Sequence, residues 1–354
     1  MKFHMKHTFM ATAALALLLS GCGANSNSDS SASSNPSPSI ALAPSVQPSS
    51  GKKLKVVATF YPMVEFSKQV AGNHAEVTGL IPTGVEPHDW EPSAKDIVQL
   101  KEADVFVYNG IVEEWAEDAL KGAANDKRIV VEATHGIELL EGAAEEEHEV
   151  GHADEHKDEH AGEHKDGHEE GHEEGHDHHH ATDPHVWLSP VLAQKQVKLI
   201  EEALSKADPA HKEDYTKNAD AYITKLKELD QAYKSGLKGA KRKEFVTQHA
   251  AFGYLAKEYG LIQVPIAGLS PEQEPSPDKM ADIIKFAKDK QVKTIFFETL
   301  VDPKVAQTIA KELGAKTDVL NPLEGLTDED RKNNQDYSSI MKKNLAALQK
   351  ALNE

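Results

Sequence analysis

The chain has 354 residues, with 39 lysine and arginine residues against 58 aspartate and glutamate residues, which gives a formal net charge of −19. This length suggests two compact domains with additional segments, and the acidic balance excludes a typical nucleic-acid partner, whose phosphates require basic patches. One cysteine against nineteen histidines excludes a disulfide scaffold and any zinc cluster built from several thiolates.

The N-terminal segment is typical of an exported lipoprotein. Two lysines precede eleven mostly apolar residues (9–19), too few for a membrane-spanning helix, which needs roughly 20. The next residues, LSGC at 19–22, resemble a bacterial lipobox, in which the cysteine is lipidated and becomes the mature N-terminus. We therefore expect a signal peptide at 1–21 and a lipid anchor on Cys22 at the outer face of the cytoplasmic membrane. An unprocessed signal with an incidental buried thiol is the alternative.

A polar stretch follows the cysteine. Between residues 24 and 50, 18 of 27 residues are Ser, Asn or Pro. Such a composition cannot bury enough apolar surface to offset the entropy lost on ordering, so it predicts a disordered tether at 22–50. The folded part should then begin at residue 51.

Short apolar runs bounded by turn residues predict the strands of the folded part, and helical patterns lie between them. Strands that alternate with helices are typical of parallel sheets with helices on both faces, so the predicted fold class is α/β. The predicted strands are 53–60, 77–81, 105–108, 129–131, 245–247, 261–265, 294–297 and 319–320.

Several predicted helices carry clear start and stop signals. Ser93 with Asp96 forms a capping box before an apolar-periodic segment. Ser276 and Asp302 are each followed by a proline, a residue favoured in the first helical turn. The helix after Asp302 should end at Gly314, because glycine readily terminates a helix.

One predicted helix is much longer than the others. Apolar and aromatic residues recur at three- and four-residue steps from Pro209 to Leu237, which is about 29 residues, or roughly 43 Å. Its position between two βα-rich halves suggests a stiff connecting helix (209–237) between an N-terminal lobe (51–208) and a C-terminal lobe (238–354). A long surface helix of one domain is the alternative.

A tract within the N-terminal lobe, residues 145–180, holds most of the negative charge. It contains 15 acidic residues, two lysines and 11 histidines, and therefore has a formal charge of −13. Its glycines and the repulsion among its carboxylates oppose a stable helix. We expect a disordered tract with weak, multiple and pH-dependent metal binding that collects ions near a tighter site. A solvated charged loop without a metal role is the alternative.

Four short stretches place a metal-binding side chain in a loop. In open α/β sheets, ligands bind beyond the carboxyl ends of the strands, and at least the last two stretches directly follow predicted strands. The stretches are GVEPHDWEP with His88, TDPHVWLSP with His185, VTQHAAFGY with His249, and LNPLEGLT with Glu324.

Taken together, the four stretches strongly resemble those of the zinc-binding receptor lipoproteins of ABC importers, the ZnuA/AdcA type. The resemblance covers essentially all of residues 52–350. It implies two α/β lobes joined by one long rigid helix, with the metal between them. His88 and His185 would be ligands from the first lobe, and His249 and Glu324 from the second. It also implies a monomeric, non-catalytic receptor that captures transported Zn²⁺ and delivers it to an ABC permease.

The chemistry of this donor set agrees with the resemblance. Zn²⁺ prefers four-coordinate tetrahedral sites and imidazole nitrogen, whereas manganese prefers more oxygen ligands. The manganese receptors of the same superfamily generally carry a second carboxylate where His249 stands, so a manganese receptor is the first alternative. A surface adhesin or metal-buffering lipoprotein also remains open.

Two further functions are disfavoured. A zinc hydrolase needs a water molecule at the fourth position and a free base, but Glu324 is expected to fill that position and no HExxH helix is predicted. A receptor for an organic solute is disfavoured because no arginine or aromatic cluster recurs at the four stretches.

Acidic residues near the histidines can orient an imidazole through its second nitrogen. Glu86 and Asp89 flank His88, and Asp183 stands two residues before His185. Each of these three carboxylates is a candidate for such a supporting role.

Other candidates lie farther from the four stretches. Glu298 follows a predicted strand and is interpreted as a surface or structural residue, with a role as ligand or supporting partner as the alternative. Three further histidines are interpreted as solvated or structural: His74, His135 and His211.

Overall fold

The computed structural model describes residues 53–142 and 181–354. The predicted signal peptide, the anchor on Cys22, the tether and the histidine-acidic tract lie outside these residues. Within the two described ranges, none of the helices combines the length and apolar character that crossing a bilayer requires.

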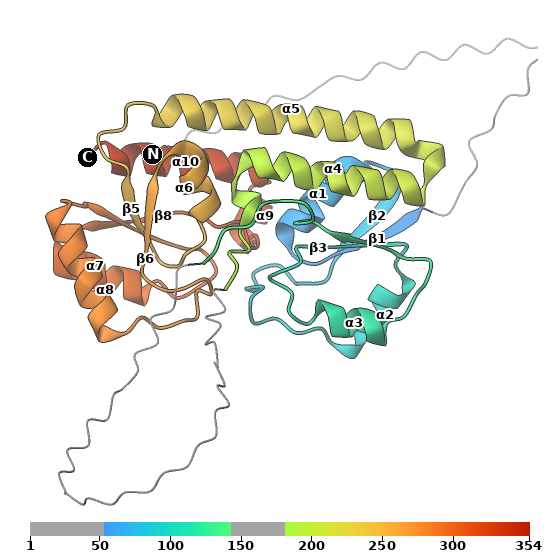
Figure 1. Ribbon diagram of the computed structural model, residues 1–354, viewed down its shortest axis with the longest axis horizontal. Helices are drawn as coiled ribbons and strands as arrows, with labels where there is room; N and C mark the ends of the chain where they lie inside the picture. Colours follow the sequence, from blue (N-terminus) through green and yellow to red (C-terminus); the bar gives the residue numbers. More distant parts are fainter. Residues whose placement is uncertain (1–52, 143–180) are drawn as a thin grey trace, which may run out of the picture. The chain divides into compact units, whose positions relative to one another are not determined.

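The first lobe is a four-stranded parallel sheet with helices on both faces (Figure 1). Alternate residues of its strands face opposite sides: Val56 packs toward α1 and α4, and Val57 packs toward α2 and α3. The strand order is β2-β1-β3-β4, with β1 at Leu54–Ala58, β2 at Ala75–Gly79, β3 at Val105–Tyr108 and β4 at Ile129–Glu132. The helices are α1 (Tyr61–Ala71), α2 (Ala94–Glu102), α3 (Ala116–Gly122), the 3₁₀ turn η1 (Val186–Leu188) and α4 (Pro190–Ala207).

The second lobe repeats this architecture. Phe245 of its central strand joins the core beneath the long helix, and the next residue, Val246, faces α7 and α8. The strand order is β6-β5-β7-β8, with β5 at Glu244–Thr247, β6 at Ile262–Pro265, β7 at Thr294–Phe297 and β8 at Lys316–Val319. The helices are α6 (Gly253–Tyr259), α7 (Pro277–Asp289), α8 (Lys304–Leu313), α9 (Asp328–Lys332) and α10 (Tyr337–Leu352).

The predicted helix signals are confirmed for α2, for α7 and for the end of α8, whereas α8 begins at Lys304 with Pro303 as its N-cap instead of in its first turn. Ser93 and Asp96 form the capping box at the start of α2, and the Ser276 side chain accepts a hydrogen bond from the backbone of Lys279 at the start of α7. Helix α8 ends at Gly314, which has φ +64°. Only glycine adopts this left-handed conformation at little cost, so the chain turns there into β8.

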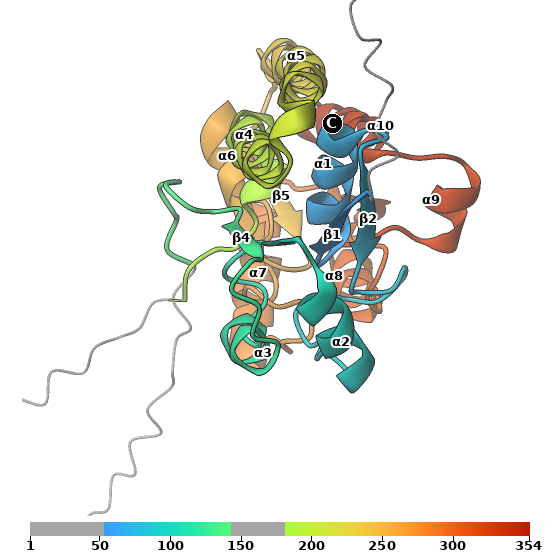
Figure 2. The same ribbon diagram turned by 90° about the vertical axis from the view of Figure 1, so that its right-hand side faces the viewer.

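The long helix is α5 (Lys212–Leu237), which the 3₁₀ turn η2 (Pro209–His211) precedes. It runs along α4 of the first lobe and α10 of the second (Figures 1 and 2). The predicted apolar face is confirmed, although Ile223 is only partly buried. The buried members of this face are Tyr215, Ala219, Tyr222, Leu226, Leu229, Tyr233 and Leu237.

One apolar core runs through both lobes beneath α5. Trp187 lies at its centre and packs edge-on against Phe60, with ring centroids 5.0 Å apart. The Trp187 indole N–H donates to the carbonyl of Pro322 in the second lobe (2.7 Å), and the Tyr337 hydroxyl donates to the Trp187 carbonyl (2.6 Å). The lobes therefore share both apolar packing and buried hydrogen bonds.

Replacing Trp187 with phenylalanine should lower the free energy of unfolding, because the buried Pro322 carbonyl loses its donor. An unpaired buried carbonyl costs about 1–3 kcal/mol, and the smaller ring adds a cavity. Trp115→Phe is the matched control, since the Trp115 indole N–H has no hydrogen-bond partner in the described part of the chain. Denaturant unfolding checks the difference, and equal losses for both variants would contradict it.

Two predicted strands differ from the structure. The strand predicted at 77–81 occupies Ala75–Gly79, and the one predicted at 319–320 occupies Lys316–Val319. Both are edge strands with largely exposed residues. Edge strands need no apolar run, so hydrophobicity locates them poorly.

Candidate metal site

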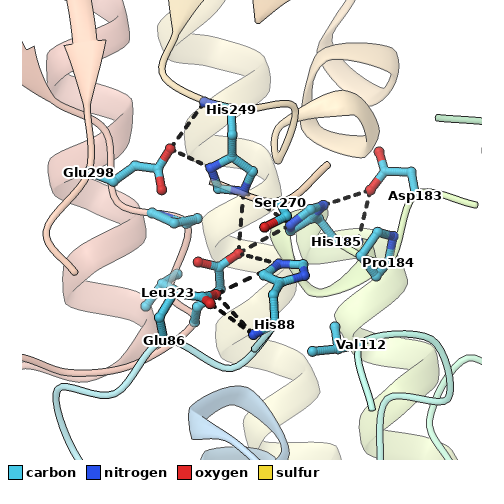
Figure 3. Close-up of polar contacts among 12 residues, drawn as sticks. Glu86, His88, Val112, Asp183, Pro184, His185, His249, Ser270, Glu298 and Leu323 are labelled. Atoms are coloured by element: carbon cyan, nitrogen blue, oxygen red, sulfur yellow. Dashed lines mark hydrogen bonds and ion pairs between the residues drawn. The ribbon is translucent and has the colours of Figure 1, made fainter. Parts of the chain in front are cut away.

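The structure brings His88, His185, His249 and Glu324 together, although they are far apart in the sequence. One nitrogen of each imidazole and one oxygen of the carboxylate all lie within 4.8 Å of one another. His185, His249 and Glu324 are buried, and the His88 side chain is 11% exposed. Figure 3 shows the three imidazoles pointing toward a common centre.

Each side chain reaches this centre from a loop. His88 lies between β2 and α2, and His185 directly precedes η1. His249 follows β5 by two residues, and Glu324 lies between β8 and α9. Both lobes therefore contribute two of the four side chains.

The distances among the donor atoms suit a tetrahedral ion. The Nε2 atoms of His88, His185 and His249 lie 3.2, 3.2 and 3.4 Å from Glu324 Oε1, and the Nε2 atoms of His185 and His249 are 3.3 Å apart. Zinc-to-ligand bonds of 2.0–2.1 Å in a tetrahedron place neighbouring donors about 3.3 Å apart. The donor set and its spacing therefore fit a four-coordinate zinc ion.

Asp183 supports His185 as predicted. The His185 Nδ1–H donates to Asp183 Oδ1 at 2.8 Å, and this bond leaves Nε2 as the nitrogen that faces the centre. The Asn109 side chain also donates to the Pro184 carbonyl (3.1 Å) and holds the same loop from the first lobe. The buried carboxylate of Glu113 accepts from the Asn109 backbone N–H (3.0 Å). No sequence pattern indicated a role for Asn109 or Glu113.

Glu298 corrects the sequence interpretation, which favoured a surface or structural role. Its side chain is 3% exposed, and its carboxylate accepts a hydrogen bond from His249 Nδ1–H (2.5 Å). Glu298 therefore orients His249 as Asp183 orients His185. The only sequence signal was its place directly after a predicted strand. The pairing of β7 with β5, which the structure shows, then brings Glu298 beside His249.

The acidic residues beside His88 act differently from the prediction. Glu86 accepts from the His88 backbone N–H at 3.0 and 3.1 Å, and its Oε1 lies 4.0 Å from His88 Nε2, the nitrogen that faces the centre, so it does not support the second ring nitrogen. Asp89 is exposed, and within the described residues its carboxylate makes no hydrogen bond to an imidazole. The bond from the His88 N–H to the Glu86 carboxylate spans Pro87 and closes a tight turn. The sequence alone did not reveal this turn.

A constrained loop presents Glu324. The preceding Leu323 is fully buried at φ +61°, a conformation that costs a non-glycine residue roughly 1–2 kcal/mol. The Leu323 N–H donates to Asn321 Oδ1 (2.7 Å), and Asn344 of α10 bonds both the N–H and the carbonyl of Asn321. With the Trp187–Pro322 bond, these contacts fix the loop before any ion binds.

His249 and Glu324 hold each other in charged forms. Burial opposes charge on His249, but Glu298 and Glu324 raise its pKa to about 10. Burial likewise opposes charge on His185, but Asp183 and Glu324 raise its pKa overall. Burial disfavours a charged Glu324, yet the imidazoles lower its pKa well below the usual range. Protons thus supply the positive charge that a cation would bring.

The three histidines interpreted as solvated or structural lie outside this cluster. His74 Nε2 lies 2.9 Å from Asp214, and His211 Nδ1 lies 2.6 Å from Asp208. The two rings stack with centroids 4.1 Å apart, where the turn before β2 meets the start of α5. His135 is exposed. The structural and solvated interpretations are confirmed.

Comparison with known proteins gives close relatives over nearly the whole folded part. The high-affinity zinc uptake system protein ZnuA of Bacillus subtilis is 51% identical over 305 residues, which are 86% of this chain and 89% of that protein. The zinc-binding lipoprotein AdcA of Streptococcus pneumoniae is 47% identical over 314 residues, which are 88% of this chain. This match spans only 58% of AdcA, so the chain corresponds to part of that longer protein.

A solved structure agrees with the fold. The crystal structure of the Zn(II)-bound ZnuA-like domain of S. pneumoniae AdcA is 44% identical, covers 86% of this chain and 100% of its own, and has a TM-score of 0.68. Residues 56–351 also match the family described as the periplasmic zinc-uptake complex component A, ZnuA. The chain therefore belongs to the ZnuA family.

Proposed function

We propose that this protein is an extracytoplasmic receptor that captures Zn²⁺ between its lobes and delivers it to an ABC permease for high-affinity zinc uptake. The proposed ligands are His88, His185, His249 and Glu324. The observation that carries the proposal is the convergence of their four donor atoms, from both lobes, at spacings that suit a tetrahedral zinc site. The zinc-uptake and zinc-binding names of the relatives support the same assignment.

Zinc suits this donor set better than manganese. Three neutral imidazoles and one carboxylate leave a net charge of about +1 around a divalent ion, and nitrogen dominates the set. Manganese, a harder ion, favours more oxygen ligands and higher coordination. A His249 supported by Glu298 supplies a nitrogen at the position where a manganese receptor would carry oxygen.

The geometry favours capture and release over catalysis. A catalytic zinc site keeps an open position for water, but here a buried carboxylate occupies the fourth corner. We therefore propose that the protein is not an enzyme and that zinc is its cargo. The rigid packing of α5 limits the accompanying motion to small hinge and loop changes.

The location follows from the N-terminal sequence. We propose that residues 1–21 are a signal peptide, that residues 22–50 form a tether, and that lipidated Cys22 anchors the exported monomer to the outer face of the cytoplasmic membrane. The lobes would span 51–208 and 238–354, with 209–237 between them. The lipoprotein name of AdcA supports an anchored receptor.

Metal titration of a variant that lacks residues 1–50 and 145–180 tests the proposal. The variant should bind one zinc ion tightly and manganese much more weakly. Cells without the protein should grow poorly only when zinc is scarce, and the wild-type chain should restore growth. Tighter manganese than zinc binding, or growth at scarce zinc without the protein, would contradict it.

A further inference from the structure

Two short segments pair beside the candidate site and carry Asp183, the partner of His185. Glu141 and Thr182 form an isolated antiparallel bridge. On one side of the bridge, the Asp183 N–H donates to the Leu140 carbonyl at 2.9 Å. The backbone position of Asp183 therefore depends on residue 140 as well as on its own loop.

Tyr254, from α6 of the second lobe, joins both segments. Its hydroxyl accepts from the Leu140 N–H (2.9 Å) and donates to the Asp183 carbonyl (2.8 Å). The side chain is buried, and its ring packs in a small cluster with Ile137 and Val186 of the first lobe. One phenol thus bonds both the Leu140 N–H and the buried Asp183 carbonyl.

The residue before it, Gly253, constrains the Asp183 side chain. A Cβ atom at Gly253 would lie 2.6 Å from Asp183 Oδ2, which is closer than real contacts allow. Gly253 is the first residue of α6 and does not have a positive φ, so its backbone would accept alanine. Alanine at this position would therefore displace the Asp183 carboxylate, which lies against the glycine.

We propose that Gly253 and Tyr254 form a positioning pair through which the second lobe sets the carboxylate of Asp183, and thereby the imidazole of His185. The inference rests on the proposed zinc-receptor function and deepens it. His185 belongs to the first lobe, but the orientation of its imidazole then depends on contact with the second lobe. The Asn109–Pro184 bond holds the same loop from the other side, so loss of either member of the pair should weaken the site without abolishing it.

Zinc affinity of the full-length protein, measured by competition with a chromophoric chelator, tests the pair. Gly253→Ala and Tyr254→Phe should each weaken zinc binding roughly 10- to 100-fold, the usual loss when a supporting contact of a metal ligand is removed. Thermal unfolding of the zinc-free variants shows whether they fold. Gly122→Ala is the glycine control, since nothing lies within 4 Å of its added Cβ. Tyr259→Phe is the tyrosine control, since it removes only the hydroxyl bond from α6 to Asp230.

A double-mutant cycle separates positioning from general packing. Asp183→Ala removes the carboxylate that the added Cβ would displace, so Gly253→Ala should cause no further loss in that background, within about threefold. Losses that multiply would overturn the proposal, as would single variants that bind zinc as tightly as their controls. Failure of the wild-type chain to bind zinc would instead overturn the proposed function.

Discussion

Replacing His249 with alanine is expected to abolish tight zinc retention. The change removes one of four donors and the imidazole hydrogen bond to the buried carboxylate of Glu298, which keeps only the longer bond from the backbone N–H of residue 249. Loss of a supporting residue typically weakens metal binding 10- to 100-fold, so loss of a ligand should exceed roughly 100-fold. Zinc content after gel filtration and competition with a chelator measure the effect.

His211→Ala is the control for this prediction. His211 bonds Asp208 and stacks on His74 at the start of α5, away from the four converging side chains. The His211→Ala variant should retain one tightly bound zinc ion. Tight zinc binding by His249→Ala would show that the ion is held elsewhere.

Zinc affinity is expected to rise steeply with pH. In the zinc-free protein, Glu298 and Glu324 raise the pKa of His249 to about 10 against the opposing effect of burial, so this imidazole carries a proton at neutral pH. Asp183 and Glu324 also raise the pKa of His185. Zinc binds only the neutral rings, and binding therefore releases protons. Each proton released makes the affinity change about tenfold per pH unit. The proton on His249 predicts a change of roughly tenfold per unit near pH 7, and the raised pKa of His185 acts in the same direction.

The stability of the zinc-free protein should change in the opposite direction. A histidine whose folded pKa lies above its unfolded value stabilises the fold fully below about pH 6.5. For His249, this stabilisation is lost as the pH rises toward about 10.

Calorimetric titration with zinc in buffers of different ionisation enthalpy counts the protons that zinc binding releases. Zinc affinity that stays constant from pH 6 to 8 would contradict the protonated site.

Much of the fold could be predicted from local patterns. The long helix was located because its apolar face repeats over many turns, and α7 was located because Ser276 and a proline mark its start. Edge strand β8 was predicted poorly, because Lys316, Thr317 and Val319 are exposed and the strand has no apolar run. Contacts with the rest of the fold, rather than an apolar sequence pattern, determine where such strands form.

The candidate site could be predicted only in part. The four converging side chains stand in recognisable motifs, but their support comes from residues that are distant in sequence. Glu298 bonds His249 across 49 positions, and Trp187 bonds Pro322 across 135. Such partners become neighbours only after the parallel strands align, so a single sequence does not reveal them.

The apolar core that both lobes share has a thermodynamic consequence. Because Trp187 and its neighbours bury surface from each half against the other, neither half can unfold without exposing part of its companion. The free energy of zinc binding at the loops therefore raises the free energy of unfolding of both lobes together. At a free zinc concentration 1,000 times the dissociation constant, this amounts to about 4 kcal/mol. Zinc bound by four side chains would thus protect both halves of the protein from proteolysis when zinc is abundant. When zinc is scarce, both halves would lose this protection together.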